Sequence, residues 1–258
     1  MGGENSSRLS THPSRSKFSD LCHFIFGPNG FYKKANPYFA LKLFKRANDK
    51  SNQDFNRELN ALVHISGQGN KHLMQLHTAF QHGDEFFLLF PLAACSLKDC
   101  FNKQDHVGNE KYFRWMLGQL LGLAEGIRAI HGDTEPDSNF LTVPQETGQV
   151  LGYHHDLKPD NVLLRKDSEN AETPFNELEM EFGRLQISDF GLGRFRDAAT
   201  GSVSVNIKGT PTYAAPESVT HGSQSRPYDI WSYGCIVLEA LVWLLEGPEG
   251  LNEFIDER

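Results

Sequence analysis

One eight-residue segment, residues 154–161, constrains the fold of this 258-residue chain more than any other feature. It reads His-His-Asp-Leu-Lys-Pro-Asp-Asn and places a carboxylate (Asp156), an amine (Lys158) and an amide (Asn161) within six residues. The proline fixes one backbone angle and stiffens the segment. The apolar residues 162–164 follow directly and are typical of a short buried strand. The pattern therefore predicts a stiff polar loop that is anchored by a strand.

A second polar position comes at the end of another apolar run. Residues 185–187 read Leu-Gln-Ile, and Ser-Asp-Phe-Gly follows at 188–191. A carboxylate at the end of a strand suits a hard cation such as Mg²⁺, which prefers oxygen ligands, and glycine lets the chain turn there. Phosphoryl transfer requires such a cation, a carboxylate near the attacking hydroxyl and positive charge on the phosphate. The two segments together contain one group for each of these tasks.

These two segments resemble the catalytic-loop and Asp-Phe-Gly motifs of the protein kinase family. Further motifs of that family follow in the expected order. A strand that reads Phe-Ala-Leu-Lys ends at Lys42, and a helix glutamate, Glu58, comes 16 positions later. Residues 215–217 read Ala-Pro-Glu, and Asp229 matches the aspartate of the next family helix. The resemblance therefore extends over residues 42–229.

The resemblance implies a role for each residue of the two central motifs. Asp156 is expected to act as the catalytic base that orients the substrate hydroxyl, and Lys158 to neutralise the γ-phosphate of ATP. Asn161 and Asp189 are expected to hold Mg²⁺. Asp229 is expected to be buried and to bind the backbone of the catalytic loop.

The nucleotide site is implied in the same way. Lys42 is expected to bind the α- and β-phosphates while it is paired with Glu58. Phe90 is expected to offer its carbonyl and Leu92 its N–H to the adenine. The other residues implied to bind nucleotide are Gly27, Gly30, Ala40 and Leu163. His154, Phe190 and Leu62 resemble members of an apolar column that links the two lobes.

The acceptor class also follows from the resemblance. Residues 156–159 read Asp-Leu-Lys-Pro and residues 209–213 read Gly-Thr-Pro-Thr-Tyr, which resembles the Ser/Thr branch rather than the tyrosine branch. Thr210, in the loop expected to bind the substrate peptide, is expected to hydrogen-bond Asp156 and Lys158. Two alternatives remain open, namely a pseudokinase-like binding module and a small-molecule phosphotransferase of the same fold. The segment 209–217 argues against the second, because it resembles a peptide-binding loop.

The implied fold is α+β with two lobes, and the hydrophobic patterns agree with it. We expect a small strand-rich N-lobe, a mainly helical C-lobe and a hinge near residues 90–94. Ser51 with Asp54 and Ser96 with Asp99 resemble helix caps. The predicted parts are a polar tail over 1–17, the N-lobe over 18–90, the C-lobe over 91–258, strands at 39–44, 85–90, 162–164 and 185–187, helices at 53–65, 111–131 and 228–245, and solvated loops at 132–152 and 166–183.

One predicted helix, 111–131, carries the clearest periodicity of the chain. We expect its apolar face to bury a core side of the C-lobe. The residues expected on that face are Phe113, Met116, Leu117, Leu120, Leu121, Ala124 and Ile127.

The sequence departs from the family pattern at three places. The glycine-rich loop ahead of Lys42 is represented by residues 26–32, which contain two glycines rather than three, so its amides are expected to cradle phosphate poorly. His155 stands where the family has an arginine that meets an activation-loop phosphate, so activity is expected to depend little on Thr200, Ser202 or Ser204. The family has several more helices after residues 228–245, so we expect an incomplete C-lobe that a missing region or a partner covers.

Charge, cysteine content and hydropathy exclude other classes. The net charge of −8 argues against a surface that coats nucleic acid. The four cysteines form no CxxC pair, which predicts reduced thiols and a cytoplasmic or nuclear location. The apolar run 230–245 is shorter than the ~20 residues of a membrane span and predicts a core helix. Gly2 fits a loose myristoylation pattern, but we interpret the N-terminus as a polar tail.

Overall fold

The computed structural model describes residues 39–45, 49–103, 108–132, 150–166, 171, 173–197, 209–221 and 226–257. All of them belong to one compact unit, Pro37–Arg258. Several predictions fall outside the described residues. These are the tail with Gly2, the glycine-loop residues Gly27 and Gly30, and the hydroxyl residues Thr200, Ser202 and Ser204.

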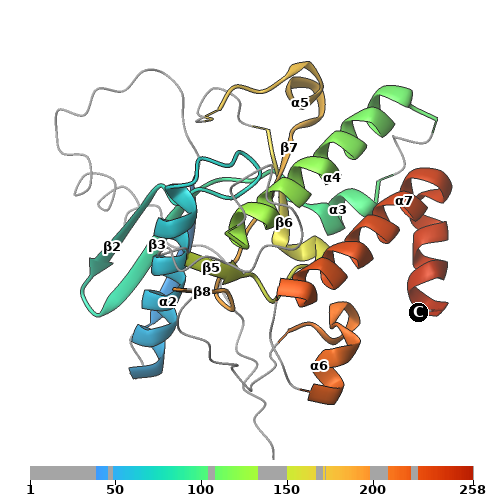
Figure 1. Ribbon diagram of the computed structural model, residues 1–258. Helices are drawn as coiled ribbons and strands as arrows, with labels where there is room; N and C mark the ends of the chain where they lie inside the picture. The colour runs from blue at the N-terminus through green and yellow to red at the C-terminus, as the bar shows by residue number, and fades with distance from the viewer. Residues whose placement is uncertain are drawn as a thin grey trace, which may run out of the picture. The chain divides into compact units, whose positions relative to one another are not determined.

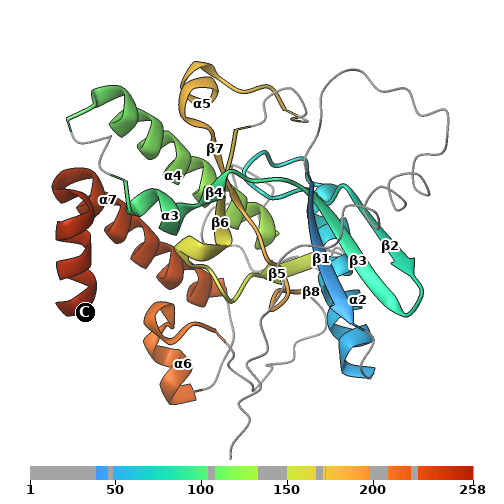
Figure 2. The same ribbon diagram turned by 180° about the vertical axis from the view of Figure 1, so that it is seen from behind.

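The N-terminal part is a small antiparallel sheet with one helix beside it (Figures 1 and 2). The sheet order is β1-β3-β2, from strands β1 (Phe39–Lys45), β2 (Thr78–His82) and β3 (Glu85–Pro91). Helix α2 (Asp49–Ser66) packs on the sheet through Phe55, whose ring stacks on Phe86 at 4.6 Å. This packing fixes the helix relative to β1, and the register of β1 places Lys42 opposite Leu88 of the central strand.

The C-terminal part is mainly helical. Its small sheet has the order β4-β6-β7, and a two-stranded ladder pairs β5 with β8. Both 3₁₀ turns, Pro159–Asn161 and Pro211–Tyr213, begin at a proline, which suits the first position of such a turn. The remaining elements are β4 (Cys95–Ser96), α3 (Leu97–Phe101), α4 (Glu110–Ile130), β5 (Val150–Tyr153), β6 (Val162–Arg165), α5 (Glu177–Phe182), β7 (Arg184–Ile187), β8 (Arg194–Asp197), α6 (Pro216–His221) and α7 (Arg226–Glu257).

Helix α4 buries a face that differs in part from the predicted one. Met116, Leu120 and Ile127 are buried as expected, but Phe113, Leu117 and Leu121 are exposed to 36%, 43% and 65%. The buried face instead follows Trp115, Leu123 and Ile130 and includes two glycines, Gly122 and Gly126. The side chains of His72 and Leu73 occupy the space above these glycines. Counting apolar side chains therefore predicts the wrong buried face for α4. The glycines belong to the buried face because they let neighbouring side chains approach the helix backbone, and a count of apolar side chains does not register them.

The helix caps give one confirmed and one wrong prediction. Ser96 caps α3, since its hydroxyl accepts from the N–H of Asp99 at 3.1 Å and the Asp99 carboxylate accepts from the N–H of Ser96 at 2.9 Å. Ser51 does not cap α2, because the helix already begins at Asp49 and includes Ser51. The first turn of α2 is polar, so apolar periodicity gave no sign of where the helix begins.

Two further boundaries differ from the prediction. The segment 166–183 was expected to be a solvated loop, but it contains α5 and the buried Glu179, whose carboxylate pairs with Arg184 at 2.7 Å. Helix α7 continues to Glu257, with a break at Gly247, where φ is 75°. That positive φ is open to glycine without a steric penalty, so the break has a local cause.

Helix α7 is long and apolar enough to cross a membrane by length and mean hydropathy. The helix carries the buried polar residues Asp229, Ser232 and Glu239. Tyr233 donates to the carbonyl of Leu120 in α4 at 2.6 Å, and the Trp243 ring lies 5.4 Å from Phe101 of α3. These contacts are typical of a core helix, and we keep that interpretation.

Candidate active site

Lysine 42 is the centre of an ion-paired cluster that joins three distant parts of the chain. Its ammonium lies 2.7 and 2.8 Å from the two carboxylate oxygens of Glu58 in α2, and 2.9 Å from Oδ1 of Asp189 after β7. The strand β1 supplies Lys42 and the helix packed beside it supplies Glu58. The sequence-based prediction required Lys42 and Asp189 to converge, and the structure brings them into direct contact.

Lys42 and Asp189 stabilise each other's charge, whereas burial outweighs the effect of Lys42 on Glu58 and raises the pKa of that carboxyl. Burial alone would lower the pKa of Lys42, but the carboxylates of Glu58 and Asp189 more than offset that effect, so the pKa of Lys42 is raised. Burial would raise the pKa of Asp189, but the Lys42 ammonium outweighs it and lowers that pKa. Lys42 is therefore positively charged and Asp189 negatively charged at neutral pH. Asp189 also has a φ of 62°, a left-handed conformation that few non-glycine residues adopt.

The catalytic-loop segment forms a second polar cluster around Asp156. Oδ1 of Asp156 accepts from the hydroxyl of Thr210 at 2.9 Å, and Oδ2 lies 3.0 Å from the ammonium of Lys158. Lys158 also donates to the Thr210 hydroxyl at 2.8 Å. Asn161 donates its amide to Oδ2 and to the carbonyl of Asp156, at 3.0 and 2.8 Å. The contacts predicted for Thr210 are present, and the three polar residues of the segment share one site.

Asp229 of α7 binds the backbone of the loop that carries Asp156. Its two carboxylate oxygens accept from the N–H groups of His154 and His155 at 2.7 and 2.8 Å, and His131 donates from Nε2 at 2.9 Å. Its side chain is fully buried. Burial would raise the pKa of Asp229, but the hydrogen bonds from His131 and from the two backbone amides outweigh it and lower the pKa. The prediction that Asp229 is buried and binds the backbone of the catalytic loop is therefore confirmed.

Hydrogen bonds through Ser188 join the two clusters. The N–H and hydroxyl of Ser188 both donate to the carbonyl of Asn161 at 2.9 Å, and His154 donates from Nε2 to the carbonyl of Ser188 at 2.9 Å. Nδ1 of His154 then accepts the N–H of Asp156 at 3.2 Å, so the hydrogen bonds of this ring place a proton on Nε2. The His154 ring packs edge-on against Phe190 at 5.0 Å. Both side chains are buried, as is Leu62.

A cavity of about 550 Å³ lies beside the Lys42 cluster. Six residues predicted to bind nucleotide line it, namely Ala40, Lys42, Glu58, Phe90, Leu92 and Leu163, and Asp189 lines it too. Sequence reasoning missed Met74, Cys95 and the helix-cap residues Ser96 and Asp99. The capping pattern of Ser96 and Asp99 was visible in the sequence, but nothing in that pattern indicates that the capped turn borders a cavity.

His155 occupies a buried position that the sequence did not predict. Its ring stacks on Tyr228 of α7 at 4.7 Å and meets Tyr153 edge-on at 4.5 Å. The residue is 3% exposed and has a φ of 70°. The side chain is thus held between two tyrosines and does not extend into solvent. The expectation that activity depends little on Thr200, Ser202 or Ser204 stays a prediction, because these residues lie outside the described ranges.

The residues of this site fit a nucleoside triphosphate and Mg²⁺. The cavity has apolar walls at Ala40, Met74 and Leu163 for a flat base and an ammonium at Lys42 for phosphate. Within the described ranges, no cluster of three or more His, Cys, Asp and Glu residues could hold a metal alone. Mg²⁺ binds in such sites through one or two protein oxygens together with substrate phosphates. Asp189 and the neighbouring Asn161 offer oxygens of that kind.

Three features of this site are those of a protein kinase domain. A lysine of the sheet pairs with a helix glutamate, the carboxylate of the Asp-Phe-Gly motif pairs with the same lysine, and a buried aspartate anchors the His-x-Asp loop. The family model described as "Protein kinase domain" matches residues 29–245. The chain belongs to the protein kinase family.

Comparison with characterised proteins agrees with this assignment. The chain is 27% identical over 218 residues, or 83% of its length, to a probable LRR receptor-like serine/threonine-protein kinase of Arabidopsis thaliana. It is 30% identical over 81% of its length to an L-type lectin-domain containing receptor kinase of the same plant, and 28% identical over 84% to myosin light chain kinase 3 of Rattus norvegicus. The matches span only 19%, 26% and 22% of those three proteins.

Proposed function

We propose that the chain transfers the γ-phosphate of ATP to Ser or Thr hydroxyls of a protein substrate. The observation that carries this proposal is the contact of Lys42 with both Glu58 and Asp189 at the edge of the cavity. The lysine holds positive charge where phosphate would bind, and a helix carboxylate orients it. The second polar cluster, around Asp156, is tied to the same place through Ser188.

Each polar residue has a task in the proposed reaction. The substrate oxygen would attack the γ-phosphorus, the bond from that phosphorus to the β–γ bridging oxygen would break, and ADP would leave. The Asp156 carboxylate would orient the hydroxyl and accept its proton, and Lys158 would place positive charge beside it. When bound, Mg²⁺ would neutralise phosphate charge, with Asp189 and Asn161 as its protein ligands.

Thr210 supports the choice of a Ser/Thr acceptor. It ties the Gly-Thr-Pro-Thr-Tyr segment to Asp156 and Lys158 and so places this segment beside the base. The relatives named above include a probable receptor-like serine/threonine-protein kinase by description. The physiological substrate would be a protein, because the segment 209–217 resembles a peptide-binding loop.

Radioactive ATP with Mg²⁺ and generic Ser/Thr protein substrates would test the proposal. Replacing Asp156 by Asn is expected to lower phosphate transfer by about 10²–10⁴-fold, since a general base contributes that much. Asp160→Asn is the matched control, because Asp160 lies four residues away in the same segment and, among the described residues, makes an exposed ion pair with Lys98 at 3.1 Å. Transfer that survives Asp156→Asn unchanged would contradict the proposed role of Asp156.

The pseudokinase-like alternative is supported by the two-glycine segment 26–32. It predicts that ATP with Mg²⁺ raises the melting temperature while no phosphate is transferred. Turnover that requires Asp156 would exclude it. If ATP with Mg²⁺ neither raises the melting temperature nor is turned over, both the kinase and the pseudokinase-like proposals are contradicted.

A further inference from the structure

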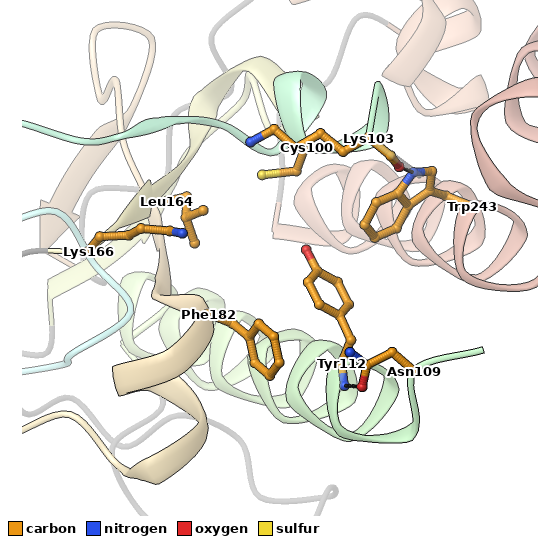
Figure 3. A pocket seen from close by; sticks show the side chains of 8 residues that line it. All are labelled: Cys100, Lys103, Asn109, Tyr112, Leu164, Lys166, Phe182 and Trp243. Carbon is orange, nitrogen blue, oxygen red and sulfur yellow. Dashed lines mark hydrogen bonds between the residues drawn. The ribbon is translucent and has the colours of Figure 1, made fainter. Parts of the chain in front are cut away.

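A second pocket, of about 270 Å³, lies on the helical part of the protein (Figure 3). It is formed where α3, the start of α4, α5, β6 and α7 meet, and no residue of the candidate active site lines it. Adjacent residues of β6 separate the two cavities, since Leu163 lines the nucleotide cavity and Leu164 lines this pocket. The pocket is therefore a distinct site that the proposed kinase function does not use.

Three aromatic rings form one wall of this pocket. Tyr112 meets Phe182 edge-on at 4.9 Å and Trp243 edge-on at 5.8 Å. Trp243 is fully buried, and its indole N–H donates to the carbonyl of Lys103 at 3.2 Å. Asn109 caps α4 by accepting the N–H of Tyr112 at 3.1 Å, which fixes the start of the helix. The wall is thus held in place by its own contacts before any ligand arrives.

Two lysines form the other side. Figure 3 shows the ammonium group of Lys166 beside Leu164 and that of Lys103 beside Cys100, both away from the Phe182 and Trp243 rings. No Asp or Glu is among the described residues that line the pocket, and among those residues neither lysine makes an ion pair with a carboxylate. Asp99, on the neighbouring turn, uses its carboxylate to accept from Ser96. The described residues of the pocket therefore combine a basic end with an aromatic end.

We infer that this pocket binds a small carboxylate that carries an aryl or short alkyl body. The two ammonium groups would bind the carboxylate, and the rings would cover the apolar body. The size agrees, because 270 Å³ lies just below the range of pockets for drug-sized ligands and suits a smaller molecule. A neutral ligand of the same shape would offer no negative charge to the two ammonium groups.

Saturation-transfer NMR with 4-phenylbutyrate as the probe tests this inference on the full chain. We expect binding with a dissociation constant on the order of 1 mM, the range for a ligand of this size. The neutral isostere 4-phenylbutanamide is expected to bind at least about ten-fold more weakly, because the hydrogen bonds between the carboxylate and the two ammonium groups are lost. The double variant Lys103→Gln/Lys166→Gln is expected to weaken the acid to a similar degree; both side chains are exposed, so the fold should persist.

Lys111→Gln is the matched control. Lys111 is an exposed lysine at the start of α4 that pairs with Glu181 at 3.6 Å and does not line the pocket, so binding should be unchanged. No binding of the acid up to about 10 mM, equal binding of the amide, or full binding by the double lysine variant would each overturn the inference. Displacement of the probe by ATP would also overturn it, because the probe would then occupy the nucleotide cavity. None of these readouts requires kinase activity, so failure of the proposed function would remain distinguishable.

Discussion

Replacing Asp229 by Asn changes one atom of the fully buried carboxylate that anchors the catalytic loop. The carboxylate accepts from the backbone N–H groups of His154 and His155 and from His131. An asparagine keeps one oxygen acceptor, but its amide nitrogen would face an N–H group that also needs an acceptor. The substitution therefore removes at least one hydrogen bond and leaves a buried donor unsatisfied while the shape of the side chain is kept.

The size of this effect follows from those contacts. A hydrogen bond to a charged group contributes about 1.5–3 kcal/mol, and an unsatisfied buried donor costs about 1–3 kcal/mol. Asp229→Asn should therefore lower the free energy of unfolding by about 2.5–6 kcal/mol. That is a large part of the roughly 5–15 kcal/mol that stabilises a typical domain. The loop that carries Asp156 should lose its anchor as well.

Urea unfolding followed by circular dichroism measures this loss. With a slope of about 3 kcal/mol per molar urea, the midpoint should fall by roughly 1–2 M. Asp160→Asn is the control, since Asp160 is exposed and its exposed ion pair with Lys98 contributes about 0–1 kcal/mol. The pKa of Asp229 is lowered in the folded state, so its contribution is full above the unfolded value near about 4 and is lost as the pH falls through the folded value. The difference in urea midpoint between the wild-type protein and Asp229→Asn should therefore become smaller at acidic pH. Equal midpoints at pH 7 for Asp229→Asn and Asp160→Asn would refute the anchoring argument.

Two further predictions concern the scaffold. Gly122→Ala would push a methyl group into the imidazole of His72 and should lower the free energy of unfolding by about 1–3 kcal/mol. Gly118→Ala, one helical turn away with open space above it, should be neutral or stabilise the fold by up to about 1 kcal/mol. Thermal unfolding distinguishes the two variants, and equal melting temperatures would contradict the packing of α4. Arg184 and the N–H of Asn176 outweigh burial and lower the pKa of Glu179 to about 2, so its contribution is full above about pH 4.5 and is lost toward pH 2. Glu179→Gln should remove roughly 3 kcal/mol at pH 7 and flatten that part of the stability–pH curve, and an unchanged curve would show that the ion pair with Arg184 does not form.

The sequence was sufficient for the parts of the fold that local patterns determine. Strands β1, β3, β6 and β7 and the capping box at Ser96 lie close to their predicted positions, because alternation and capping are read from neighbouring residues. The buried face of α4 was partly wrong for a physical reason. Gly122 and Gly126 bury that face by letting His72 and Leu73 approach, and this effect depends on a distant segment.

The same division applies to the candidate site. The resemblance to protein kinases implied that Lys42 would pair with Glu58 and share one site with Asp189, and the structure brings the three together; their catalytic roles stay predictions. The position of His155 could not be predicted, because its ring packs against Tyr228, a residue 73 positions further along the chain. The second pocket was also hidden, since residues from five separate elements form it and no single segment has a pattern that indicates it.

Strand β6 is four residues long, yet its neighbouring leucines face different compartments of the protein. Leu163 points to the proposed adenine region and Leu164 to the aromatic pocket behind it. Only the thickness of one backbone strand divides the two spaces at this point. A bulkier or smaller side chain on either leucine would shift that strand, so the two compartments cannot be reshaped independently here.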